Sequence, residues 1–289
     1  MSAIVQYTLQ GLASGSFYAL SALGLAVIFG LLGVVNFAHG ACFMLGAVGA
    51  AILLAEVDAG FWVSLAVIPV LLFVFGVIVE RLLVRWLVAL DPLYNFLLTF
   101  GLALLVVDLV KRRYGVSALR FAAPPQLDGV LQVGGVRLPY YQLFVFGFSL
   151  VVCAIVWLVL STTRLGMIVR ASTENGDLTR ALGIDVGRWV TPVFGFGIAL
   201  AGLSGVLAAP MRAVTADMGS NFVIVLFAVV VIGGLGSIAG AVVAGFAVGL
   251  LEAFGQAYAP SLSQILIFVL MAVVVLLRPA GLFGKEERA

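Results

Sequence analysis

The hydrogen-bonding and ionisable side chains inside the apolar segments of this sequence are few. They are Tyr18, Ser21, Asn36, His39, Asn95, Thr99, Asp108, Glu252 and Gln256. A polar group surrounded by hydrocarbon is costly unless it has a partner or water, and such groups often mark functional contacts. These residues are therefore the first candidates for a site.

Asn36 and His39 form the most distinctive pair among them. They lie three residues apart in the run NFAHG, so on a helix they share one face. Such a pair would cap a helix or tie two helices together, or it would line a route for a polar solute. A proton relay needs an acid–base chain across the membrane, and only Asp108 and Glu252 are available for it.

Sequence motifs for metal binding and catalysis are lacking. His39 is the only histidine, and together with Cys42 it falls short of the three or four ligands that a metal site needs. The sequence has no G-x-x-x-x-G-K-[ST], no H-E-x-x-H and no hydrolytic Ser-His-acid constellation. We therefore expect a non-catalytic chain without a cofactor of its own, so any uphill transport would be powered elsewhere.

The composition is that of a membrane protein. Hydrophobic residues make up 64% of the chain and charged residues 10%, against about 45–50% and about 25% in soluble domains. The basic residues lie between apolar segments instead of forming a patch, which excludes a nucleic-acid partner. No basic residue precedes Arg81, so a cleaved signal peptide is not expected. Cys42 and Cys153 lie in apolar segments and are predicted to be small buried residues.

Apolar runs long enough to cross a membrane predict an all-α, polytopic transmembrane helix bundle, with residues 1–289 as a single domain. The run Phe222–Gly255 is too long for one crossing and is expected to break at GGLGSIAG, Gly233–Gly240. This gives eight to nine membrane segments, some of them broken or re-entrant. The other candidate spans are Tyr7–Gly30, Ala38–Ala55, Phe61–Val79, Leu93–Val110, Tyr140–Leu160, Trp189–Ala209 and Leu262–Leu277.

Glycine is frequent, with 34 residues concentrated in the apolar segments. Pairs spaced four apart, such as Gly11/Gly15 and Gly245/Gly249, favour close helix packing. The alternative for the glycines after Val231 is an unwound backbone beside a water-filled path. We assign a candidate substrate path to Tyr18, Asn36, His39, Thr99, Gly233, Gly234 and Gly236.

A charged segment, residues 161–188, interrupts the apolar runs. Its apolar residues Leu178, Ala181, Leu182 and Ile184 recur at helical spacing, which predicts a short amphipathic helix. We expect this helix to begin at Ser172 or Thr173 and to end at Gly183. Its apolar face needs a partner: the rest of the chain, the membrane surface or a groove on another protein.

The basic residues favour a cytoplasmic position for segment 161–188. With two crossings in 222–255, nine Lys and Arg residues lie inside and six outside, although the run Lys111–Arg113 is then external. The loop 111–139 is expected to be extracytoplasmic. Its alternating pieces Val130–Val133 and Val136–Leu138 predict a small β-hairpin that serves as a docking surface.

Four blocks of the sequence resemble the LivH-type permeases of branched-chain amino acid ABC importers. The first is GLASGSFYALSALGLAVIFGLLGVVNFAHGACFMLGAVG at Gly11–Gly49. The others are RASTENGDLTRALGI at Arg170–Ile184, VIGGLGSIAGAVVAGFAVGLLEA at Val231–Ala253 and RPAGLFG at Arg278–Gly284. They cover essentially the whole chain in order, and NFAHG and GGLGSIAGA are the most specific parts.

The resemblance implies a role as one part of a five-part importer in the bacterial inner membrane. Its partners would be a second related permease, two ATP-binding subunits that bind ATP and Mg²⁺, and an extracytoplasmic solute-binding protein. Segment 170–184 would be the coupling helix that docks in a groove of the ATPase. Relative to a Glu-Ala-Ala loop it reads Glu174-Asn175-Gly176. The coupling residues would be Arg170, Glu174, Asn175, Leu178, Ala181, Leu182, Gly183 and Ile184.

Two other classes of protein are compatible with a membrane bundle. A stand-alone channel or an ion-coupled secondary transporter would need no ATPase, but it usually carries more intramembrane charge than this chain does. An intramembrane enzyme would need a nucleophile and a base, and no sequence motif supplies this pair. The solute itself, a branched-chain amino acid or a similar small molecule such as urea or an amide, is not specified by the sequence.

Overall fold

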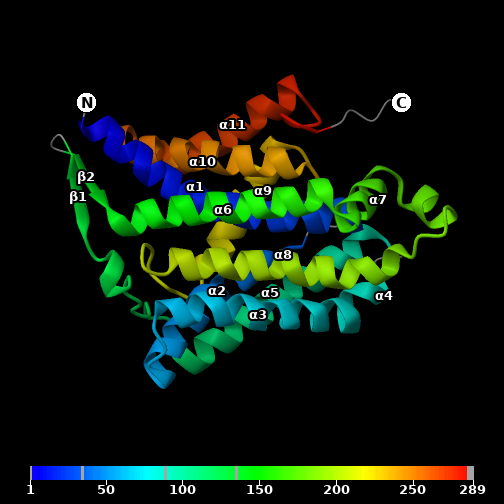
Figure 1. Cartoon of the computed structure of the whole chain (residues 1–289), viewed down its shortest axis with the longest axis horizontal. Coiled ribbons are helices and arrows are strands. Elements are labelled where there is room, and N and C mark those ends of the chain that lie inside the picture. The colour runs from blue at the N-terminus through cyan, green and yellow to red at the C-terminus, as the bar shows by residue number, and fades with distance from the viewer. Residues whose placement is uncertain (1, 34–35, 88–89, 134–135, 285–289) are drawn as a thin grey trace.

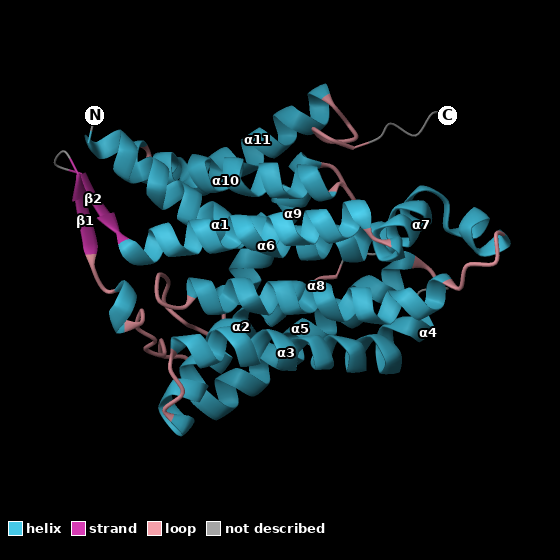
Figure 2. Ribbon diagram, viewed as in Figure 1, coloured by secondary structure: helices cyan, strands magenta, loops and turns pink. Residues whose placement is uncertain are grey.

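The computed structural model describes residues 2–33, 36–87, 90–133 and 136–284, except for the side chains at 173–177 and at a few isolated positions. Helices dominate these residues, as Figure 2 shows. The α-helices are α1 Ser2–Leu32, α2 Ala38–Val57, α3 Phe61–Val79, α4 Arg85–Leu87, α5 Pro92–Tyr114, α6 Tyr140–Thr162, α7 Arg164–Ala181, α8 Val186–Ala208, α9 Met218–Gly233, α10 Ile238–Tyr258 and α11 Ser263–Leu277.

Eight helical segments among the described residues are long and apolar enough to cross a membrane. One of them runs through α3, a π-helical turn at Glu80–Val84, and α4. The ninth apolar helix, α9, has only 16 residues. The prediction of an all-α polytopic bundle is therefore confirmed, with α9 as its short segment.

The long apolar run Phe222–Gly255 breaks at its glycines, as the sequence predicted. α9 ends at Gly233 and α10 begins at Ile238, and Gly234 and Gly236 have φ angles of 102° and 78°. Such angles are accessible to glycine at little cost. Ser237 then caps α10 by accepting a hydrogen bond from the amide of Gly240 at 3.1 Å.

The two ends of the bundle carry different elements (Figure 1). Helix α7 and the end of the described C-terminal segment, residues 278–284, lie at one end, which we call the α7 end. The N-terminus and the antiparallel hairpin of β1 (Val130–Val133) and β2 (Val136–Pro139) lie at the other, the hairpin end. The predicted hairpin is confirmed. The C-terminal segment and α7 lie at the same end of the bundle, as expected if the run 222–255 crosses the membrane twice.

Helix α1 packs most extensively on α10, and glycines make the contact possible. A Cβ added to Gly11 would lie 2.8 Å from the Cα of Leu250, and one added to Gly245 would lie 2.5 Å from the backbone nitrogen of Ala19. Neither position has room for a side chain. The four-residue spacing of these glycines therefore serves close helix packing.

The start of the amphipathic helix was predicted wrongly. Helix α7 begins at Arg164, about two turns before Ser172, and the hydroxyl of Thr163 accepts from the amide of Gly166 at 3.3 Å. Most residues from Arg164 to Ala171 are good helix formers, so the helix extends back to the next capping side chain. Its end was predicted correctly. Gly183 has φ 82°, and the amide of Ile184 donates to the carbonyl of Thr179 at 3.4 Å.

Candidate functional site

Helix α7 exposes apolar side chains at one end of the bundle. Leu178 on α7 is 58% exposed and Leu182, in the turn directly after α7, is 73% exposed, while Ile184 beyond that turn is half-buried. Glu174 and Asn175 lie in α7, and their side chains belong to the part that the structure does not describe. An exposed apolar face on a helix outside the spans is unusual for water-facing surface and is typical of a docking surface.

Arg170 fastens α7 to the bundle. Its guanidinium donates hydrogen bonds to the backbone carbonyls of Leu160 and Ser161 near the end of α6, the second at 3.4 Å. A cation at this position satisfies carbonyls that the helix itself leaves free. Arg170, which was predicted as a coupling residue, thus connects the predicted coupling helix to α6, one of the helices long enough to span a membrane.

A second connection runs from α8, which follows α7, to α3. The hydroxyl of Thr191 donates to the carboxylate of Glu80 at 2.6 Å, and both residues are buried. Glu80 opens the π-helical turn of the α3 segment. Turns of this kind are frequent at functional sites. Sequence analysis missed this pair because nothing local links residues 80 and 191.

Asn36 and His39 are buried between helices. The side-chain oxygen of Asn36 accepts from the amide of Ala38 at 3.0 Å and so caps the start of α2. His39 contacts the backbone carbonyl of Ser21 on α1 through Nε2 at 3.0 Å. Because a carbonyl only accepts, Nε2 carries the proton. The pair therefore makes both structural contacts that its spacing allowed, and a role in a solute route stays a prediction.

Thr99 and α9 complete this region. The hydroxyl of Thr99 accepts from the amide of Phe37 at 3.3 Å and donates to the carbonyl of Asn95 at 2.9 Å. The start of α2 also meets α9, where Val223 lies 2.6 Å from a Cβ added to Gly40. Thr99 and the NFAHG run, predicted separately, are thus brought together by the structure.

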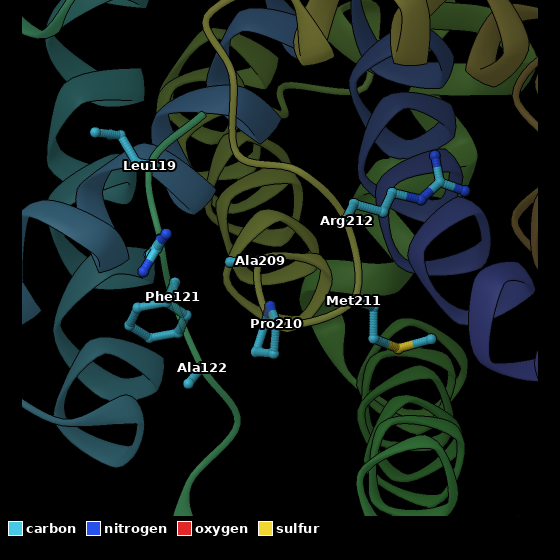
Figure 3. Close-up of a pocket in the computed structure, with 8 residues that line it drawn as sticks. Leu119, Phe121, Ala122, Ala209, Pro210, Met211 and Arg212 are labelled. Atoms are coloured by element: carbon cyan, nitrogen blue, oxygen red, sulfur yellow. The ribbon is translucent and has the colours of Figure 1, made fainter. Parts of the chain in front are cut away.

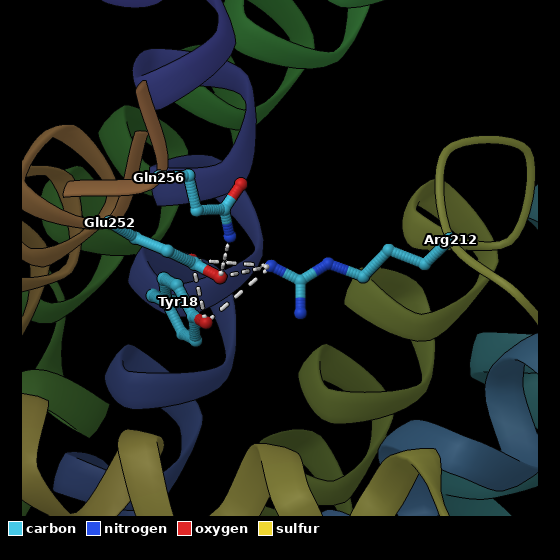
Figure 4. A network of polar contacts seen from close by, with 4 residues as sticks. All are labelled: Tyr18, Arg212, Glu252 and Gln256. Atoms are coloured by element: carbon cyan, nitrogen blue, oxygen red, sulfur yellow. Dashed lines mark hydrogen bonds and ion pairs between the residues drawn. The ribbon is translucent and has the colours of Figure 1, made fainter. Parts of the chain in front are cut away.

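Tyr18 belongs to a different cluster near the hairpin end, shown in Figure 4. Its hydroxyl donates to the carboxylate of Glu252 on α10 at 2.9 Å, and Gln256 donates to the same carboxylate at 3.2 Å. The guanidinium of Arg212, from the segment between α8 and α9, approaches both Tyr18 and Glu252. The ring of Tyr18 stacks on Phe222 of α9, with centroids 5.3 Å apart.

Arg212 was missed as a site residue by sequence reasoning. Its side chain is 32% exposed and that of Glu252 is 16% exposed. Burial by itself lowers the pKa of the guanidinium, but Tyr18 and Glu252 outweigh this effect and raise that pKa above its ordinary value. The one signal in the sequence was a single cation in the short connection between two apolar segments.

A shallow pocket of about 330 Å³ adjoins this segment. It lies between residues 119–122 and 209–212, where the amide of Leu119 donates to the carbonyl of Val214 at 2.9 Å. Figure 3 shows that the side chain of Arg212 leaves the pocket and points toward α1. The pocket and the Arg212 guanidinium are therefore on opposite sides of the same segment.

The glycine turn after α9 lies apart from these clusters. About 16 Å of helix separates Gly233 from Phe222, at a rise of 1.5 Å per residue. The C-terminal segment 278–284 covers the turn: Leu282 and Phe283 donate to the carbonyls of Ile232 and Gly233 at 2.9 and 3.1 Å. A Cβ on Gly234 would lie 2.5 Å from the backbone nitrogen of Gly284. The structure therefore does not bring these glycines to Tyr18 or Asn36.

The apolar helices, their buried polar contacts and their glycine packing define a multi-pass membrane protein. The chain matches, over residues 7–275, the family described as branched-chain amino acid transport system / permease component, and it belongs to that family.

Curated relatives agree over nearly the whole length. The chain is 31% identical to the high-affinity branched-chain amino acid transport system permease protein BraD of Pseudomonas aeruginosa, over 98% of this chain and 96% of the relative. It is 27% identical to the permease protein LivH of Escherichia coli K12 over the same shares. It is 31% identical to a probable LivH of Methanocaldococcus jannaschii, over 92% and 88%.

Proposed function

We propose that this chain is a permease subunit of an ABC importer in the bacterial inner membrane. It would move branched-chain amino acids or similar small solutes. Membership of the permease family and the similarity to transport-system permeases support the transport role. The single observation that carries the coupling role is the pair of exposed leucines at the end of α7, Leu178 on the helix and Leu182 in the turn after it.

In this proposal the power comes from two ATP-binding subunits, which bind ATP and Mg²⁺ and dock on segment 161–188 at the cytoplasmic side. A second, related permease completes the membrane part. A solute-binding protein docks on the extracytoplasmic loop 111–139. This chain itself is not an enzyme and carries no cofactor.

The contacts of α7 supply a mechanical route. When the ATPases close, they push α7, and Arg170 passes the motion to α6 through the carbonyls at its end. The short link from α7 into α8 passes it on, through Thr191, to Glu80 in the π-helical turn that follows α3. Tilting these helices switches the path lined by Tyr18, Asn36, His39 and Thr99 between its two openings.

The test is a variant with Leu182→Asp and Ile184→Asp. Placing charges on the apolar face should abolish co-purification of the ATPases, because a buried unpaired carboxylate costs several kcal/mol. Membrane insertion should be unchanged. The matched control is Val116→Asp at the hairpin end, since Val116 is 73% exposed, as is Leu182. Full ATPase stoichiometry in the double variant would reject the docking role. Leucine uptake that persists without ATP would favour a stand-alone carrier.

A further inference from the structure

The helical segment Phe61–Leu87 is longer than the hydrocarbon core of a membrane requires. Its 27 residues extend about 40 Å at a rise of 1.5 Å per residue, whereas the hydrocarbon core is about 30 Å thick. Exposed tryptophans lie near both ends, Trp62 at 44% and Trp86 at 75% exposure. Tryptophan is enriched where the hydrocarbon meets the lipid headgroups. The last two turns of the segment, at the α7 end, therefore lie at headgroup level.

Two cations face outward in these turns. Arg81 and Arg85 are both exposed, and their separation of four residues places them about one helical turn apart on the same side. Among the described residues, neither guanidinium has a hydrogen-bond acceptor or an acidic partner. Each guanidinium carries five N–H donors in an arrangement that suits the oxygens of a phosphate group.

The nearest acidic side chains in the sequence are engaged elsewhere. Glu80 is buried and accepts a hydrogen bond from the hydroxyl of Thr191 at 2.6 Å. Asp91 accepts from the amide of Leu93 at 2.8 Å and so caps α5. The π-helical turn thus directs its acid into the bundle and leaves its cation outside. Within the described part of the chain, the outward face therefore keeps two positive charges that no carboxylate balances.

An apolar stripe runs beside the two cations. Leu82, which is 67% exposed, and Trp86 are also four residues apart, and each directly follows one of the arginines. A soluble anion would contact the guanidiniums alone. A phospholipid fits both stripes, because its phosphate would lie on the cations while its apolar part covers the leucine and the indole ring.

We propose that Arg81, Arg85 and Trp86 bind the headgroup region of an anionic phospholipid in the leaflet at the α7 end. The guanidiniums donate to the phosphate oxygens in charge-assisted hydrogen bonds. Two positive charges favour a lipid with net negative charge over a zwitterionic one. This leaflet is the cytoplasmic one in the proposed function, but the binding itself does not depend on that function.

The experiment measures lipid adducts of the purified full-length chain in detergent by native mass spectrometry. Two lipids with the same acyl chains are compared: phosphatidylglycerol, which is anionic, and phosphatidylcholine, which is zwitterionic. The wild type should bind phosphatidylglycerol more tightly. An excess of inorganic phosphate should not displace it, because phosphate makes no contact with the apolar stripe.

The variants separate the two cations from charge in general. Arg81→Gln with Arg85→Gln should weaken phosphatidylglycerol binding about 25-fold, about fivefold per charge, and leave phosphatidylcholine binding unchanged. Arg81→Lys with Arg85→Lys keeps both charges and should stay within a few-fold of the wild type. The matched control is Arg112→Gln with Arg188→Gln. It removes two exposed guanidiniums that already form ion pairs, at 2.6 and 2.8 Å, and should match the wild type.

Four results overturn the proposal. Equal affinity of the wild type for the two lipids would remove the preference for an anionic headgroup. An equal loss in the control pair would make the effect one of net charge. Displacement by inorganic phosphate would indicate a site for free anions. Loss of co-purified ATPase from Arg81→Gln with Arg85→Gln, with phosphatidylglycerol binding unchanged, would assign the cations to a protein partner. The importer role has its own test on segment 161–188 and stands if the lipid site fails.

Discussion

Replacement of Gly245 by alanine tests the packing of α1 on α10. A Cβ at this position would lie 2.5 Å from the backbone nitrogen and 2.6 Å from the Cα of Ala19, whereas ordinary contacts begin near 3.4 Å. Both neighbours are backbone atoms of a helix, so neither moves alone. The two helices would have to separate by about 1 Å, and the close contact along their length would be lost.

The magnitude follows from two opposing effects. Overpacking of this kind costs about 1–3 kcal/mol, and rigid backbone puts Gly245→Ala at the upper end. Alanine returns at most about 1 kcal/mol through its higher helix propensity. A net loss of about 2 kcal/mol remains. Gly147→Ala on α6 is the matched control, because no atom lies within 4 Å of its added Cβ. At Gly147 only the higher helix propensity of alanine acts, and it is stabilising.

The assay is thermal denaturation of the purified chain or complex in detergent, read as the loss of monodisperse protein. Gly245→Ala should melt several degrees below the wild type, and Gly147→Ala should melt at or above it. Equal stability of the two variants would refute the close-packing argument. It would mean that α1 and α10 adjust to a methyl group at no cost.

Three further predictions concern transport. Glu80→Leu leaves the Thr191 hydroxyl without its acceptor and should raise the amount of ATP consumed per leucine imported. Glu80→Gln keeps an acceptor and should consume about as much ATP per leucine as the wild type. Equal ATP consumption per leucine in the two variants would contradict a role of the Thr191–Glu80 contact in coupling. His39→Leu removes the contact to Ser21 and should slow uptake while the complex still assembles; wild-type uptake would restrict His39 to a structural role. Gly183→Val forces a branched side chain to φ 82°, which should weaken ATPase docking by about 1–2 kcal/mol and lower the yield of co-purified ATPase. Gly187→Ala is the control. The same ATPase yield in both variants would refute the role of Gly183 in docking.

Local patterns predicted most of the fold. The spans follow from apolar length, the break after Gly233 from glycines that adopt positive φ, and the end of α7 from Gly183. The start of α7 was predicted wrongly because Ser172 is a good capping residue in isolation, whereas in the structure the residues before it continue the helix back to Arg164. Capping signals compete with propensity, and the sequence alone does not rank them.

The candidate site was harder because its contacts are not local. Tyr18 and Glu252 are separated by 234 positions in the chain, and Arg212 reaches them from a third element. Tyr18, Asn36 and Thr99 were selected for polarity inside apolar segments, which identifies candidates but not their partners. Only packing of α1 against α10 brings the acid and the phenol together.

The C-terminal segment has a consequence for biosynthesis. The terminal carbonyls of α9 are satisfied by the amides of Leu282 and Phe283, which the ribosome makes about 50 residues later, after α10 and α11. Until then this short helix has an unfinished end in a lipid environment. The C-terminal end of α9 can therefore be completed only after α10 and α11 have been made, and a truncation before Gly281 should leave these carbonyls without their donors while the earlier helices are already in place.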